Sequence, residues 1–183
     1  MRIFVVLRAW QLFLVQHVPL LILIAVIPYS ISTGQSLSPH VFGFAIGLLG
    51  LTVYGWIYSI GVIANQRVGA QHQRGDVIFK GGLIYAVLYA FVFGSVVSAA
   101  KGMPLWLVPA HLVSAAATIY ALWFAGKQLM CLRHQRDVEF LEVSGPMFLI
   151  WTFPLGVWFV QPVVNDLLTT PAEVTPSQES QND

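Results

Sequence analysis

The chain has 183 residues, of which 57% are hydrophobic and 9% are charged, and its mean hydropathy is +0.73. A soluble domain carries about 25% charged residues, so this composition excludes an ordinary water-exposed surface and predicts a protein embedded in lipid. The net charge of +1 provides no basic surface for nucleic acid, and the single cysteine, Cys131, excludes an internal disulfide and a cysteine-rich metal site.

Five apolar segments predict an all-α polytopic transmembrane bundle, because a membrane-spanning helix needs about 20 mostly apolar residues. In chain order they cover residues 9–32, 41–64, 81–100, 104–126 and 146–164. Gly43 and Gly47 in the second segment predict close packing between helices. The fifth segment is the shortest and contains Pro154 and Gly156. We therefore expect it to be kinked near Ile150 to Pro154 or to re-enter the membrane.

The basic residues are divided unevenly between the two ends of the predicted bundle. Eight of the nine would lie on one side of a five-span protein: Arg2, Arg8, Arg67, Arg74, Lys80, Lys127, Arg133 and Arg136. The positive-inside rule makes that side cytoplasmic, which predicts a cytoplasmic N-terminus and a C-terminal tail outside. A re-entrant fifth segment would instead keep the tail in the cytoplasm. We expect residues 1–168 to form the bundle and 169–183 to form a disordered acidic tail.

Two cytoplasmic loops, at 64–82 and 126–145, resemble each other. Each contains a His-Gln-Arg tripeptide, which ends at Arg74 in the first loop and at Arg136 in the second, and each continues with an Asp-Val pair. A duplication would make two equivalent helical hairpins, as in some transporter folds. Arg74 and Arg136 would then be candidates for binding an anionic ligand, because guanidinium groups clamp phosphate and carboxylate groups. The alternative is a chance similarity of two positively charged loops whose arginines form ion pairs.

Three further polar side chains are candidate ligand-binding residues. His111 lies about two turns inside the outer end of the fourth segment, where it could relay a proton or ligate a metal. Alternatively, it hydrogen-bonds a neighbouring helix or faces the outer interface. Gln161 and Asn165 are i, i+4 neighbours that follow the Pro154–Gly156 break. They could present two amides to a partner helix or to a small ligand, or they could be the polar residues of a kinked terminal helix.

Both ends of the chain carry a recognisable pattern. The segment from Phe148 to Asn165 reads Trp-x-Phe-Pro-x-Gly-x-Trp-x-x-Gln-Pro-x-x-Asn from Trp151 onward, and the first segment opens with Arg8-Ala-Trp-Gln-Leu-Phe, which ends at Phe13. These two stretches resemble a family of small, uncharacterised bacterial multi-pass membrane proteins. The resemblance implies a location in the bacterial inner membrane and implies no activity.

The sequence contains no ready-made catalytic motif such as G-x-S-x-G, H-E-x-x-H or a phosphate-binding glycine loop. It therefore predicts a non-enzymatic accessory or interaction protein without a cofactor or metal. Its expected partners are the lipid bilayer and another membrane protein or a second copy of itself, and not nucleic acid. The main alternative is a small-molecule transporter or channel subunit built from two duplicated hairpins. A membrane-embedded enzyme acting on lipid would depend on His72, His134 and nearby carboxylates.

Overall fold

The computed structural model describes residues 3–33, 38–100 and 103–169, and all regular structure in these ranges is helical. The α-helices are α1 (Ile3–Val6), α2 (Ala9–Thr33), α3 (Pro39–Arg67), α4 (Val77–Ala100), α5 (Val108–His134), α6 (Phe140–Trp151) and α7 (Gly156–Thr169). Two short 3-10 helices, η1 (Ala70–His72) and η2 (Leu105–Leu107), lie in the connections. The prediction of an all-α protein is confirmed.

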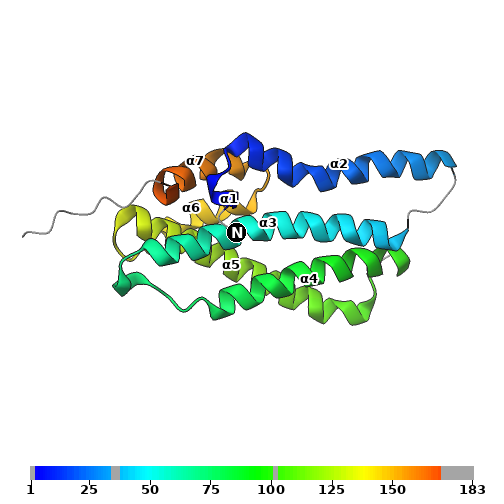
Figure 1. Cartoon of the computed structure of the whole chain (residues 1–183). Helices are drawn as coiled ribbons and strands as arrows, with labels where there is room; N and C mark the ends of the chain where they lie inside the picture. The colour runs from blue at the N-terminus through cyan, green and yellow to red at the C-terminus, as the bar shows by residue number, and fades with distance from the viewer. Residues whose placement is uncertain (1–2, 34–37, 101–102, 170–183) are drawn as a thin grey trace, which may run out of the picture.

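The helices α3, α4 and α5 form an antiparallel bundle of three long rods (Figure 1). Each rod is long and apolar enough to cross a membrane. The helices α3 and α4 approach closely at their glycines, as expected. A methyl group at Gly43 would collide with the backbone of Ser95, and one at Gly47 would collide with the ring of Phe91. The protein is therefore a multi-pass helical membrane protein by the length and hydropathy of its helices.

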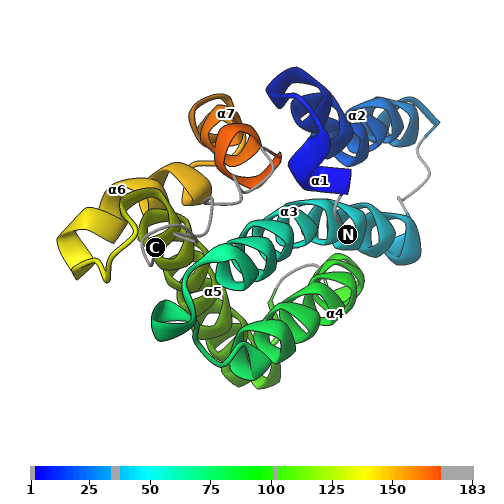
Figure 2. The same ribbon diagram turned by 60° about the vertical axis from the view of Figure 1, so that its left-hand side comes forward.

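The hydrophobic core joins the two ends of the chain to this bundle. Its centre is aromatic: the rings of Phe79 and Phe124 stack with their centroids 4.4 Å apart, and Trp56 is fully buried. Val5 of α1 and Val160 of α7 belong to the same core cluster. In Figure 2, where one end of the bundle is turned towards the viewer, α1, α2 and α7 lie together on one face of α3, opposite α4.

The fifth predicted segment does not form a single helix. The helix α6 ends at Trp151, α7 begins at Gly156, and the pair is bent by 117°. The chain therefore folds back, and Arg67 at the end of α3 donates from Nη1 to the Leu167 carbonyl near the end of α7, at 3.1 Å. The start of α6 lies at this same end of the bundle, because Asp137 pairs with Lys127 near the end of α5.

This geometry does not confirm a fifth span. A helix that entered at the Arg67 end and crossed the bundle would end at the opposite side, whereas α7 returns to the Arg67 end (Figure 1). The expected kink at Pro154 is instead a complete break in the helix. The predicted tail lies almost wholly within residues 170–183, which are outside the described residues.

The break has local causes that can be read from the residues. Pro154 has no N–H to donate, and a residue that precedes proline, here Phe153, is disfavoured in the α region. The peptide bond between them is cis. The N–H groups of Leu155 and Gly156 both donate to the Thr152 carbonyl and so close a tight turn. Gly156 packs directly on the Leu149 carbonyl oxygen, where a Cβ atom would not fit.

Candidate functional site

Gln161 lies where the two ends of the chain meet. The indole Nε1 of Trp56 in α3 donates to Gln161 Oε1 at 2.8 Å. The Gln161 Nε2 faces the carbonyl oxygens of α1 and donates to Phe4 at 2.9 Å and to Leu7 at 2.7 Å. A one-turn helix such as α1 leaves its carbonyls without partners inside the helix. The fully buried Gln161 amide supplies those partners.

Asn165 stands one turn further along α7 and extends this contact. With the amide turned so that its nitrogen faces the backbone, Asn165 Nδ2 donates to the Val5 carbonyl oxygen of α1 at 2.7 Å. The sequence predicted that these two amides lie on one face of a helix, and in the structure both face α1 from the same side of α7. The helix that they contact is the N-terminal turn of the same chain. A role toward a separate ligand stays a prediction.

Aromatic side chains continue the same contact between α2 and α7. The ring of Phe13 lies 3.9 Å from the ring of His17 and 5.6 Å from the ring of Trp158. His17 Nδ1 is also 2.6 Å from the Phe13 carbonyl oxygen, and Phe153 of the turn lies beside the His17 ring. The two stretches that carried the family resemblance are therefore in contact. We call this set of contacts around Gln161, Asn165 and Trp56 the end-to-end lock.

The basic residues gather at the end of the bundle where α3 and α5 finish, which we call the basic end (Arg67, Arg74, Lys127, Arg133 and Arg136). Asp137 is the centre of one group there: Lys127 Nζ lies 3.0 Å from its Oδ1 and Arg74 Nη2 lies 3.9 Å from the same atom. Both cations also lie 5.7 Å from the centroid of the Trp123 ring. The hydrogen bond that Lys127 donates to Asp137 holds the pKa of the Asp137 carboxyl below its usual value.

Arg136 has a different environment from Arg74. Its guanidinium contacts both carboxylate oxygens of Glu142, with Nη1 at 3.1 Å from Oε2. Glu142 in turn accepts the Glu139 N–H and caps the start of α6. Arg136 therefore fastens a helix terminus, whereas Arg74 shares a carboxylate with Lys127. The two arginines are not placed equivalently, and the hairpins differ as well, since α3 and α4 are both continuous while α5 is followed by two short helices.

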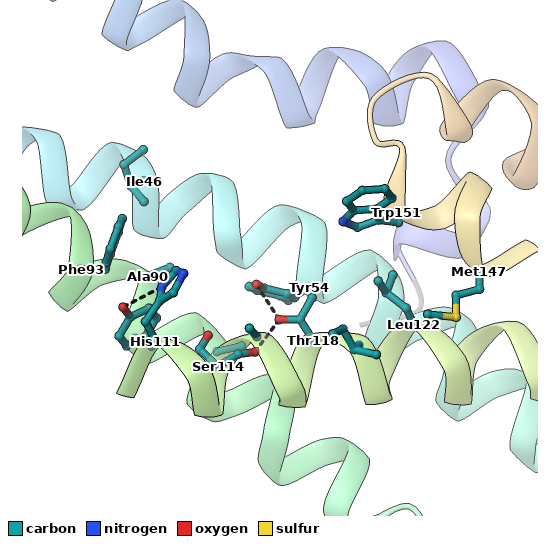
Figure 3. Close-up of a pocket in the computed structure, with 14 residues that line it drawn as sticks. Ile46, Tyr54, Ala90, Phe93, His111, Ser114, Thr118, Leu122, Met147 and Trp151 are labelled. Carbon is teal, nitrogen blue, oxygen red and sulfur yellow. Dashed lines mark hydrogen bonds between the residues drawn. The ribbon is translucent and has the colours of Figure 1, made fainter. Parts of the chain in front are cut away.

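A cavity of about 540 Å³ lies between α3, α4 and α5. Figure 3 shows its walls, with Ile46 and Tyr54 on α3 and the side chains from His111 to Leu122 on α5. Two pairs of its polar atoms lie within hydrogen-bond distance: Tyr89 Oη lies 3.0 Å from His111 Nδ1, and Tyr54 Oη lies 3.1 Å from Thr118 Oγ1. His111 thus contacts a neighbouring helix, which is one of the roles considered for it.

Comparison with known proteins does not extend this description. No family model, curated protein or solved structure matches the chain. The function is therefore argued from the geometry of its own residues.

Two buried amides lie outside the predicted ligand-binding residues. Gln16 in α2 and Gln128 in α5 are fully buried, and within the described residues neither side chain has a hydrogen-bond partner. The sequence analysis placed Gln128 in the loop at 126–145, because the fourth predicted segment ends at residue 126, whereas α5 continues to His134. Lys127 can stay inside the helix because Asp137 neutralises it.

The acidic, histidine and cysteine side chains do not gather into a metal site. Across residues 3–33, 38–100 and 103–169, no group of His, Cys, Asp and Glu side chains could hold a metal ion.

Proposed function

We propose that this chain is a non-enzymatic accessory protein of a bacterial inner membrane and that it contacts a partner membrane protein through the α6–α7 hairpin. The observation that supports this proposal is the exposure of the turn between the two helices. Trp151 and Leu155, which flank the turn, are 65% and 67% exposed, and the residues between them are only half-buried. The inner-membrane location rests on the resemblance of the two chain ends.

The proposed arrangement in the membrane has four spans, α2 to α5, with the basic end in the cytoplasm. The positive charges at that end favour the cytoplasmic side. The hairpin then enters the bilayer from the cytoplasm and returns to it. Its turn reaches well into the hydrocarbon, because Phe153 lies beside His17, which is about 13 Å along α2 from Arg8 at a rise of about 1.5 Å per residue.

A turn at this depth needs a protein cover. Non-helical backbone within the hydrocarbon is tolerated where protein or a water-filled cavity surrounds it, because lipid cannot satisfy its polar groups. The bundle of this chain covers the inner side of the turn, through Phe153 and His17. The outer side carries Trp151, Leu155 and Phe159, which this chain leaves exposed. A second membrane protein, or a second copy of this chain, would complete the cover.

Site-specific photo-cross-linking in native membranes tests this proposal. A photoreactive phenylalanine analogue at Leu155 is expected to give a discrete protein adduct. The matched control is the same analogue at Leu88, a 61% exposed leucine on α4, which is expected to give none. Equal adducts from both positions, or no protein adduct from Leu155, would contradict the proposal. An adduct of twice the mass of the chain would identify the partner as a second copy.

A further inference from the structure

We infer that the cavity between α3, α4 and α5 binds one acyl chain of a bilayer phospholipid. This inference does not rest on the proposed accessory function, because Trp151 is the only residue that the cavity shares with the hairpin surface formed by Trp151, Leu155 and Phe159. It is carried by the depth of the cavity, by its width and by the position of its polar side chains.

The cavity lies at the depth of the hydrocarbon. Its walls come from the middle of α3 and α4, at residues 46–54 and 86–93, from the first half of α5, at residues 111–122, and from Met147 and Trp151 of α6. The helices α3, α4 and α5 are long and apolar enough to span a membrane. The cavity is open on one side, so it faces lipid and not water. An opening of this kind is filled by hydrocarbon or by another protein.

The width of the cavity favours hydrocarbon over a helix. From His111 to Leu122 the cavity extends about 16 Å along α5, at a rise of about 1.5 Å per residue. Counting all the space between the wall atoms, about 1100 Å³ with the opening included, the mean cross-section over that length is about 70 Å², which is still below the roughly 80–110 Å² of a helix about 10–12 Å in diameter. Carbon atoms in contact lie about 3.5–4.0 Å apart, so one extended chain of methylene groups fits this width.

The ends of the cavity suit the two ends of an acyl chain. The hydrogen-bonded pair of Tyr89 and His111 lies at the end nearer η2, where the exposed Trp106 belongs with the membrane interface. An ester group of a phospholipid would lie beside this pair. At the opposite end, Met147 and Trp151 of α6 close the cavity (Figure 3). The acyl chain of the lipid would therefore run inward from His111 and end against the α6–α7 hairpin.

Two adjacent alanines of α5 provide a matched test. Both are exposed, but Ala115 lines the cavity and Ala116 does not. The full chain is reconstituted in vesicles of phosphatidylethanolamine and phosphatidylglycerol that contain a trace of phosphatidylethanolamine with a diazirine in one acyl chain. After irradiation, mass spectrometry of the peptides locates the adducts. We expect adducts concentrated between His111 and Leu122 and at Trp151, at a level that falls at least fivefold in Ala115→Trp and is unchanged in Ala116→Trp.

Two kinds of result would contradict the binding of an acyl chain in this cavity. Adducts spread evenly over the exposed faces of α4 and α5, or equal labelling in both variants, would mean that the cavity has no preferred lipid. A native mass spectrum in which a dimer is present and is lost only in Ala115→Trp would mean that a second copy occupies the cavity. Ile119→Trp, from the same wall, replaces Ala115→Trp if that variant does not fold, as judged by gel filtration in detergent.

Discussion

A glutamine amide inside a membrane protein has two donor hydrogens and an acceptor oxygen to satisfy, and Gln161 satisfies both of its polar atoms. Its oxygen accepts from Trp56, and its nitrogen faces the carbonyl oxygens of Phe4, Val5 and Leu7 in and directly after α1. Lipid offers no replacement for these bonds. The end-to-end lock therefore holds the short α1 in place by hydrogen bonding as well as by the burial of Val5.

Replacing Gln161 by leucine is expected to lower the free energy of unfolding by about 1–3 kcal/mol, because it leaves the buried Trp56 N–H and the α1 carbonyls without partners. Thermal unfolding of the purified protein in detergent measures the change. Gln66→Leu is the control, since Gln66 is an exposed glutamine on α3. A loss of equal size in both variants would show that the lock contributes nothing specific.

The sequence predicted the position of Gln161 and Asn165 on one helix face but not their partner. Their partner is the backbone of α1, and a carbonyl oxygen has no side-chain signature that a sequence can reveal. The ion-pair partners of the two arginines could not be predicted for a different reason. Arg74 and Arg136 stand in similar tripeptides, yet each binds a different carboxylate, Asp137 or Glu142. The carboxylate that an arginine reaches depends on the path of the loop, which the tripeptide does not determine.

At the scale of single elements, the hairpin formed by α6 and α7 depends on one close approach. Gly156 begins α7 directly against the carbonyl oxygen of Leu149 in α6, with no room for a side chain. The fold of the hairpin therefore requires glycine at this position for reasons of space. Gly145, within α6 of the same hairpin, has open space where its side chain would be.

These two glycines predict opposite results for the same substitution. Gly156→Ala is expected to force α6 and α7 apart and to destabilise the protein by about 1–3 kcal/mol, the range for overpacking a tight contact. Gly145→Ala is expected to leave stability unchanged or raise it by up to about 1 kcal/mol, since alanine favours a helix. Midpoints of thermal unfolding for the two variants provide the comparison. If Gly156→Ala unfolds like the unmodified chain, the tight turn is not required.

The sequence predicted best the helices whose position follows from the length of an apolar segment alone. The predicted segment 41–64 corresponds to Pro39–Arg67, and 81–100 corresponds to Val77–Ala100. The last segment differs because its composition suits a span, whereas its path depends on contacts between residues. Pro154 and Gly156 marked the break in advance, but the 117° bend depends on how α7 packs on α3 and α1, which no local pattern encodes.

At the scale of the whole molecule, the uneven distribution of charge and the direction of α7 determine which side of the membrane each end occupies. The basic end contains the end of α7, through the contact between Arg67 and Leu167. In the proposed four-span arrangement, residues that follow Thr169 therefore leave the bundle on the cytoplasmic side. This differs from the tail position expected from five spans.

Reporter fusions distinguish the two arrangements. A reporter that is active only in the cytoplasm is expected to be active when fused after Thr169 and inactive when fused after Met103, which precedes α5 at the opposite end of the bundle. The fusion after Met103 is the control for export. Loss of activity after Thr169 would restore the five-span arrangement and remove the basis for a re-entrant hairpin.

The end-to-end lock also has a consequence for the order in which the protein is made. Leu7 and Gln161 are separated by 154 residues, so α1 leaves the ribosome long before the amide that holds it. The closing of so long a loop is also opposed by chain entropy. During synthesis α1 therefore remains without its final partner until Gln161 has been translated. A chain that is cut short before Gln161 would present an unfastened N-terminus, a feature by which cellular quality control could distinguish it from the finished protein.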